Sequence, residues 1–227
     1  MRRVVLWQLW SMAMKETLLR ITLVILFLSA SVSCRGQDMR VTTPAPLANE
    51  LITQGTPQSI KTFEQRAMEA AKQWHPDAYM TGAHAIVPAS RSDGTFTIQG
   101  RVSFNFRSKA DTQHSYLVGF DSKGALDVFE FSYTVPHSDD LPIESGDWPL
   151  DSLDAWQIVQ AKGGNALLET YRQQTIDMRC ALSLQRWNPP HTGRVLWHVG
   201  CMDAVTEKSF DFWIDAQTGK VVEKRVE

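Results

Sequence analysis

The segment from Met178 to Asp203 most constrains the fold, because it contains two strands whose pairing can be assigned residue by residue. When Trp187 is placed opposite Arg194 across the loop N-P-P-H-T-G, apolar side chains of both strands fall on one face and mostly polar ones on the other. A shift of one residue would divide the apolar set between the faces, so pattern and loop favour the same register. The pairs predicted on the apolar face are Leu184 with Trp197, Leu182 with Val199, and Cys180 with Cys201.

The residues after this hairpin continue the sheet. Apolar and polar side chains alternate from Phe210 to Asp215, as in a strand with one buried face. The turn A-Q-T-G then leads into a last strand from Lys220 to Val226, and Gly219 supplies the positive φ that such a turn usually needs. The C-terminal part is therefore predicted to contain three or four short antiparallel strands.

Residues 1–33 have the pattern of a secretory signal peptide and are excluded from fold reasoning. A basic front is followed by an uncharged stretch, residues 21–33, which contains the apolar run I-T-L-V-I-L-F-L. This apolar centre is too short to span a bilayer, whereas its length and the small residues after it are typical of a secretory signal. We therefore expect an exported protein.

The end of this segment, S-A-S-V-S-C, resembles the lipobox of bacterial lipoproteins. The resemblance implies that Cys34 carries a lipid that anchors the protein on the outer side of the cytoplasmic membrane or in the periplasm. Ser31 departs from the usual Leu or Val three residues before the cysteine, so ordinary signal cleavage without lipidation is the alternative. Residues 34–57, rich in Thr, Pro, Gln and Asn, are predicted to form a flexible tether.

Two of the three cysteines, Cys180 and Cys201, are predicted to form a disulfide. The hairpin register places them directly opposite one another, at a separation that a disulfide can bridge, and export makes the bond chemically permissible. In the chain-entropy model, closing this loop contributes about 3 kcal/mol to stability. Two buried free thiols in the core are the alternative.

Residues 58–135 are predicted to form a first unit of one helix and a sheet. Apolar residues recur at helical spacing from Ile60 to Trp74, and the helix is expected to begin at Thr56-Pro57 and to end before Pro76. The candidate strands, separated by turns that contain S-D-G and D-S-K-G, lie at 83–88, 95–106, 114–120 and 125–133.

The last of these strands alternates in a way that predicts which side chains face outward. Glu130 lies between Phe129 and Phe131, and neighbouring residues of a strand point to opposite faces. We therefore expect Glu130 to face outward.

The order of elements then begins again. Residues 136–150 are predicted to be a connector, rich in Asp, Ser and Pro. After it, Asp151 or Ser152 caps a helix that ends at Gly163-Gly164, a short second helix is possible, and the strands described above follow. Residues 151–227 are therefore predicted to form a second unit.

The two units match best at their last turns. In each, an aromatic strand ends in Asp, a short turn carries Gly, and an outgoing strand follows, so that Asp121 and Gly124 correspond to Asp215 and Gly219. The match suggests an internal duplication. The predicted fold is α+β, with two helix-plus-antiparallel-sheet units packed as one tandem domain.

The second unit, a capped helix that ends in G-G, then a strand hairpin, then F-W-I-D-A-Q-T-G-K-V-V, resembles a PepSY-type domain. Members of this family typically end in an apolar strand, then D-A-x-T-G-x-V and a last strand, and the first unit of this chain matches only in outline. The resemblance implies an extracytoplasmic, non-enzymatic module that binds or restrains another protein, with no catalytic residues to carry over. The residues that match the ending are Asp215, Ala216, Thr218, Gly219 and Val221.

The sequence contains no recognised catalytic, metal or cofactor motif. It has no H-E-x-x-H, G-x-S-x-G, C-x-x-C, P-loop or G-x-G-x-x-G, and none of its six histidines lies at helical ligand spacing from another. Asp139 and Asp140, with Glu144 and Asp147, could attract calcium but lack the spacing of a calcium loop. Asp215 is predicted to be a turn residue. We therefore predict no enzyme activity, no metal and no cofactor; the rival classes are a hydrolase with a site between the units and a purely structural envelope protein.

Two tryptophans are the candidates for contact with a partner. Trp187 and Trp213 have the parity opposite to the core residues of their strands, so they could form an aromatic strip that receives a protein or peptide, or lie buried beneath the other unit. The formal net charge of −2, without a basic run, disfavours nucleic-acid binding. The predicted function is a non-enzymatic, extracytoplasmic binding or inhibitory module.

Overall fold

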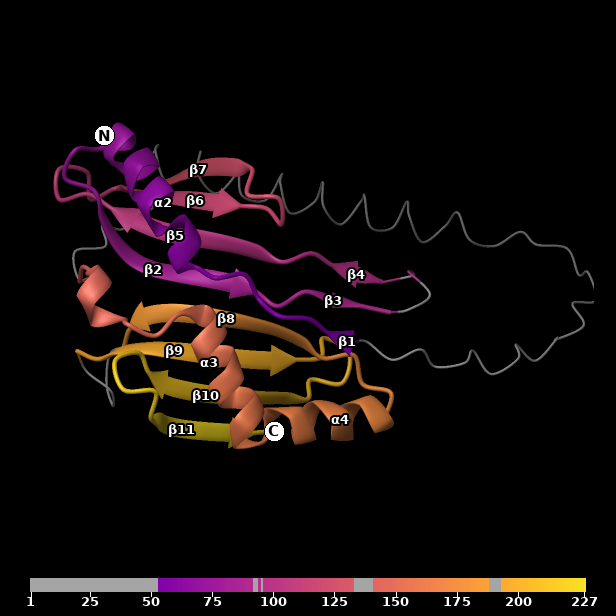
Figure 1. The fold of residues 1–227 in the computed structure, drawn as a ribbon. Helices are drawn as coiled ribbons and strands as arrows, with labels where there is room; N and C mark the ends of the chain where they lie inside the picture. Colours follow the sequence, from indigo (N-terminus) through magenta and orange to yellow (C-terminus); the bar gives the residue numbers. More distant parts are fainter. Residues whose placement is uncertain (1–52, 92–93, 95, 133–140, 188–192) are drawn as a thin grey trace, which may run out of the picture. The chain divides into compact units, whose positions relative to one another are not determined.

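An antiparallel sheet of eight strands forms the centre of the computed structural model, which describes residues 53–91, 94, 96–132, 141–187 and 193–227 (Figure 1). The strand order β11-β10-β9-β8-β2-β5-β6-β7, together with the helices, confirms the predicted α+β class. The helical elements are α2 (Lys61–Trp74), η1 (Ser145–Asp147), α3 (Ser152–Val159), the π-helical turn η2 (Gln160–Gly164) and α4 (Asn165–Gln173). The strands of this sheet are β2 (Tyr79–Ile86), β5 (Arg101–Arg107), β6 (His114–Phe120), β7 (Leu126–Ser132), β8 (Arg179–Arg186), β9 (Val195–Met202), β10 (Ser209–Asp215) and β11 (Val221–Val226).

A small second sheet includes residues that the sequence assigned to the tether. β1 (Thr53–Gln54) pairs with β3 (Ala89–Ser90), which pairs with β4 (Thr97–Ile98). The end of the expected tether is therefore part of the folded structure, and the single strand predicted at 95–106 is divided between β4 and β5. The predictions that lie outside the described residues concern the signal peptide at 1–33, Cys34 and the tether up to residue 52.

The large sheet consists of two similar halves joined edge to edge. The first half is α2 followed by the meander β2-β5-β6-β7, and the second is α3 and α4 followed by β8-β9-β10-β11. The first strands of the two halves, β2 and β8, pair antiparallel and make the sheet continuous. The described residues of both halves belong to one compact unit.

The strand registers relate the halves by a pseudo-two-fold axis at the pair His84–Ser183. Counting outward from this pair, each strand of the first half has an equivalent strand in the second half. Asp121 and Asp215 then fall at equivalent positions, two residues beyond the equivalent pair Gly119 and Trp213, as the matching turns suggested. The residues paired in succession outward from His84 are Ser103, Gly119 and Asp127, and those paired outward from Ser183 are His198, Trp213 and Glu223.

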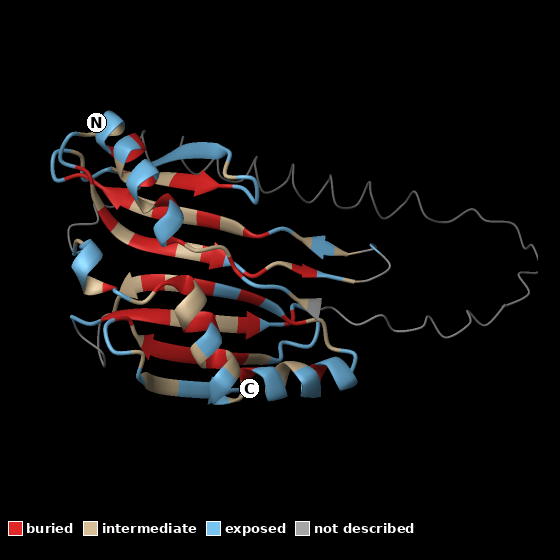
Figure 2. Ribbon diagram, viewed as in Figure 1, coloured by how far each residue is buried: buried red, intermediate tan, exposed pale blue. Residues whose placement is uncertain are grey.

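The helices cover one face of the sheet, and the core lies beneath them (Figures 1 and 2). In β5, Val102, Phe104 and Phe106 point to this face and are almost fully buried. Ser103 and Asn105, which alternate with them, point to the other face and are half-buried. We call this second face, which no described helix covers, the open face.

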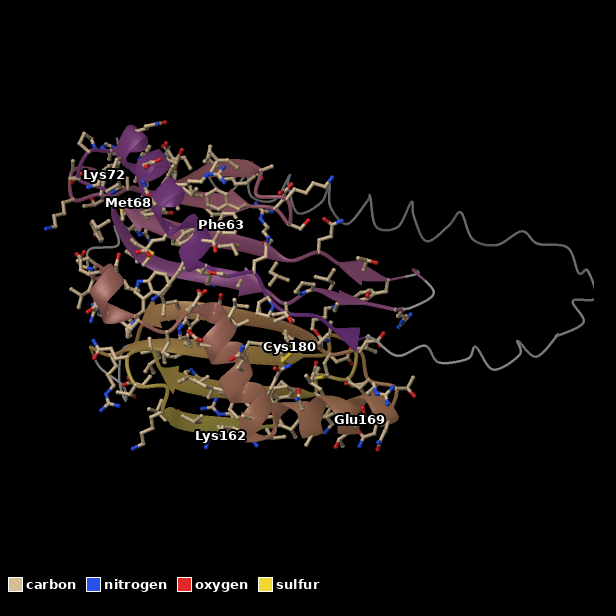
Figure 3. All side chains as sticks on the ribbon, in the orientation of Figure 1. Phe63, Met68, Lys72, Lys162, Glu169 and Cys180 are labelled. Carbon is tan, nitrogen blue, oxygen red and sulfur yellow. A yellow bond between two sulfur atoms is a disulfide. The ribbon has the colours of Figure 1, made fainter. Side chains whose placement is uncertain are left out.

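The predicted hairpin register is confirmed. Trp187 donates its backbone N–H to the carbonyl of Arg194, and Cys180 pairs with Cys201 across β8 and β9. These two cysteines form a disulfide on the helix-covered face, where both are buried (Figure 3). The turn after β10 also has the predicted form, because Gly219 has a φ of 72°.

The predicted connector contributes to the core as well as linking the halves. The backbone N–H of Ile143 donates to the carbonyl of Met80 at 2.8 Å, which fixes this segment beside β2. Trp148 is fully buried, and its ring lies edge-on to that of Trp197 at a centroid distance of 6.3 Å. The sequence did not predict that Ile143 and Trp148 are buried, because the surrounding segment is rich in Asp, Ser and Pro and has no periodic apolar pattern.

One buried carboxylate caps the first helix of each half. Asp151 is the N-cap of α3, and its Oδ1 accepts the Ser152 N–H at 2.7 Å. The same oxygen accepts the N–H groups of Ile60 at 3.1 Å and Lys61 at 3.3 Å, where α2 begins. α2 therefore begins at Lys61 instead of at Thr56-Pro57, because its cap comes from the other half of the chain.

We expect Asp151→Ala to lower the free energy of unfolding by about 3 kcal/mol, since it removes a cap shared by two helices and leaves the Ser152 and Lys61 N–H groups without this acceptor, while Ile60 keeps its bond to Ser152 Oγ. Urea unfolding at neutral pH measures this loss. Asp127→Ala, which removes an exposed carboxylate paired with Arg101, is the control and is expected to cost at most about 1 kcal/mol. Equal losses in the two variants would contradict the shared cap.

Candidate functional site

The two tryptophans predicted to bind a partner lie together on the open face. The ring of Trp213 stacks on His198 at a centroid distance of 4.7 Å, and Trp187 lies edge-on to Trp213 at 6.0 Å. The guanidinium of Arg225 lies 5.1 Å from the centroid of the Trp213 ring. All four residues belong to the second half, so neighbours within that half, and not the other unit, leave Trp213 only 6% exposed. A role of Trp187 and Trp213 in binding stays a prediction.

The polar groups of the open face form separate pairs instead of a catalytic relay. Ser183 Oγ lies 2.8 Å from His84 Nδ1, whereas Asp211 Oδ1 lies 2.6 Å from the Nε2 of a different histidine, His198. A serine nucleophile requires one histidine to contact both the hydroxyl and the carboxylate. Neither histidine makes both contacts in the described part of the chain.

His84 is a neutral structural residue at the pseudo-two-fold axis. Its Nε2 lies 3.0 Å from the amide nitrogen of Asn105, a donor, so Nε2 accepts and Nδ1–H donates to Ser183. Burial lowers the pKa of His84 below its ordinary value of 6.5, because the charged imidazolium would lose its hydration.

This burial predicts a loss of stability as the pH falls below 6.5. In that range the unfolded chain binds a proton at His84 and the folded chain does not, so protonation favours unfolding. We expect the free energy of unfolding to fall between pH 6.5 and pH 5, with His84 contributing at most about 1.4 kcal/mol per pH unit. In the His84→Gln variant, the free energy of unfolding, measured by urea unfolding at each pH, should fall less steeply with pH over this range.

Titration of carboxylates does not interfere with this measurement, because carboxylates with a lowered pKa change charge at lower pH. An example is Asp203, whose pKa the hydroxyl of Thr206 holds below the ordinary 3.8. Identical slopes for the wild type and His84→Gln between pH 6.5 and 5 would show that His84 is not buried in its neutral form.

The orientation of β7 differs from the prediction. Glu130 is exposed, as expected, but it lies on the helix-covered face, where its Oε2 accepts the indole N–H of Trp74 at 3.0 Å. The register explains this, because Glu130 pairs with Tyr116, whose ring stacks on Trp74 at 5.1 Å. Phe129 and Phe131 therefore lie on the open face.

β7 is an edge strand whose apolar side chains are exposed on both faces. Every residue of the strand is exposed, as Figure 2 shows. Among the described residues, no strand pairs with its outer edge. The opposite edge strand, β11, carries the charged run Glu223, Lys224 and Arg225 instead. The exposed fractions on β7 are 50% for Leu126, 40% for Val128, 44% for Phe129 and 47% for Phe131.

The described residues contain neither a cluster of metal-ligating side chains nor a membrane-spanning helix. They contain no group of three or more His, Cys, Asp or Glu side chains placed to hold a metal ion. In the same part of the chain, no helix is both long and apolar enough to cross a bilayer. The pair Asp139 and Asp140, considered for calcium, lies outside the described residues.

Comparisons with known proteins give one weak structural similarity. No protein-family model matches the chain, and no curated protein matches it. Among solved structures, the chain is similar to a Clostridium difficile 630 protein described as a lipoprotein, with a TM-score of 0.44, 12% sequence identity, and coverage of 77% of this chain and 95% of that chain. The PepSY resemblance of the second unit therefore rests on its sequence alone.

Proposed function

We propose that this protein is an exported, lipid-anchored, non-enzymatic binding module that holds an extended segment of a partner protein along β7. The observation that carries the proposal is the outer edge of β7, which pairs with no strand in the described part of the chain and has four exposed apolar side chains. Edge strands of soluble proteins are usually protected by charges, bulges or covering elements, as the charged run of β11 illustrates. β7 carries two exposed carboxylates, Asp127 and Glu130, but four of its seven side chains are apolar and exposed, so we expect this edge to have a binding role.

Strand addition fits the chemistry of β7. The backbone N–H and C=O groups on its outer edge would bond to the backbone of the added segment, which gives affinity without a particular sequence. Leu126 and Val128 on one face, and Phe129 and Phe131 on the other, would select apolar side chains at alternating positions of the partner. A segment held in this way is restrained, which agrees with a binding or inhibitory role.

The rival hydrolase has less support. A hydrolase site between the halves would use polar groups near the β2–β8 pair, and those groups pair as Ser183 with His84 and as Asp211 with His198. This arrangement lacks a general base that could activate the hydroxyl and be held by the carboxylate.

The double variant Phe129→Lys with Phe131→Lys tests the binding edge. Peptides selected from a random peptide library on the immobilised mature protein should bind the double variant at least about tenfold more weakly, because two charges would be placed beside an apolar strand. The thermal midpoint should change little, since both side chains are exposed. Fluorescence anisotropy of the labelled peptides measures affinity.

Val226→Lys on the opposite edge strand is the matched control, because Val226 is also exposed, at 48%. It should leave peptide affinity unchanged. If the selected peptides bind the β7 double variant as tightly as the wild type, β7 is not the binding edge.

The anchor is tested separately. We expect Cys34→Ser to release the protein from the membrane fraction, because the lipobox-like segment S-A-S-V-S-C would then have no thiol to carry a lipid. Fractionation with a carbonate wash measures the distribution. Retention of the variant in the washed membranes would rule out a lipid at Cys34.

A further inference from the structure

β7 forms one end of the large sheet, and the chain itself shows how such an edge can be covered (Figure 1). β2 and β8 pair antiparallel, so the two halves join edge to edge around the pseudo-two-fold axis at His84–Ser183. The same operation, applied to two whole molecules, would pair β7 of one copy with β7 of another. A strand that pairs with its own copy must be self-complementary about the point where the two-fold axis passes.

One register pairs every residue of β7 with a residue of a second β7. The strand has seven residues, so its central residue, Phe129, lies on the two-fold axis and faces Phe129 of the second copy. With Asp127 or Glu130 on the axis instead, two carboxylates would face each other, and directly opposed like charges destabilise a sheet. With Val128 on the axis, the last two residues of the strand would have no partner in the second strand.

The central register also suits the side chains on both faces of β7. Residues directly opposite one another in an antiparallel pair share a face, so Asp127 lies opposite Phe131 on the open face and Glu130 lies opposite Val128 on the helix-covered face. Phe129 meets its own copy, and the rings of Phe129 and Phe131 already lie 6.4 Å apart within one molecule. The phenylalanines of two copies would therefore form one continuous aromatic row, and cross-strand aromatic pairs stabilise a sheet.

We propose that the partner of β7 is a second copy of this chain, and that two copies form a dimer whose β7 strands pair antiparallel with Phe129 on the two-fold axis. The inference rests on the proposed strand addition at β7 and names its partner. The joined sheet would contain the eight strands of each copy. Because one strand from each copy makes a small interface, we expect a reversible dimer with a Kd of about 10 μM.

Sedimentation equilibrium of residues 34–227 tests the dimer, with Cys34→Ser so that this position carries neither a lipid nor a thiol. We expect monomer and dimer to exchange with concentration. Phe129→Lys should weaken self-association at least about tenfold, because two ammonium groups would face each other across the axis. Val226→Lys on β11, the opposite edge strand, is the matched control and should leave the dimer unchanged. A chain that stays monomeric at about 200 μM, twenty times the expected Kd, would overturn the proposal.

Mixed variants test the position of the axis. Phe129→Glu should also lose self-association, whereas an equimolar mixture of Phe129→Lys and Phe129→Glu should form a heterodimer, because opposite charges then face each other. Both variants should keep the thermal midpoint of the wild type, since Phe129 is 44% exposed. A mixture that associates no better than either variant alone would overturn the pairing around Phe129.

Phe129→Cys gives a second measurement that adds no charge. Directly opposed residues have Cβ atoms close enough for a disulfide, so mild oxidation should link two copies of this variant. Val226→Cys, on the opposite edge strand, should stay unlinked under the same conditions. Equal linking of the two variants would overturn the proposal.

Peptide binding separates this inference from the strand addition on which it rests. Selected peptides that dissociate the dimer would support both. Peptides that bind β7 of a chain that stays monomeric would assign the edge to a foreign segment and overturn the dimer, while the proposed function stands. A dimer that Phe129→Lys leaves intact would have its interface elsewhere, which also overturns the inference.

Discussion

The pairing of β2 with β8 is the contact on which the rest of the structure depends. A four-stranded meander with a helix on one face leaves both of its edges unpaired, and this ladder removes one edge from each half. Its core-facing residues are small on one strand and large on the other, with Ala83 opposite Leu184 and Ala85 opposite Leu182. Asp151 adds to the same junction, because it places the beginnings of α2 and α3 around one carboxylate.

The pseudo-two-fold arrangement lets the two halves differ where the core does not constrain them. Trp213 fills the open face of the second half, whereas its equivalent, Gly119, leaves space that the guanidinium of Arg101 covers. His198 corresponds to Ser103 in the same way. The open face therefore carries aromatic rings in the second half where the first half has small residues and an arginine.

Sequence patterns predict most where local rules decide the outcome. The hairpin register, the disulfide of Cys180 and the turn at Gly219 follow from alternation, loop length and backbone conformation, which involve few residues. Trp148, Glu130 and the cap of α2 could not be predicted in this way, because each depends on a partner more than 45 residues away.

The position of Glu130 on the helix-covered face bears on the whole edge. An inward phenylalanine would bury more apolar area, but the space beneath β7 already contains the stacked rings of Trp74 and Tyr116 and the Trp74 indole N–H, which needs an acceptor. Because neighbouring residues of a strand alternate, satisfying that N–H with Glu130 turns Phe129 and Phe131 outward. The hydrogen bond between Trp74 and Glu130 thus accompanies the apolar open face of the edge strand, and a partner strand would cover what folding leaves exposed.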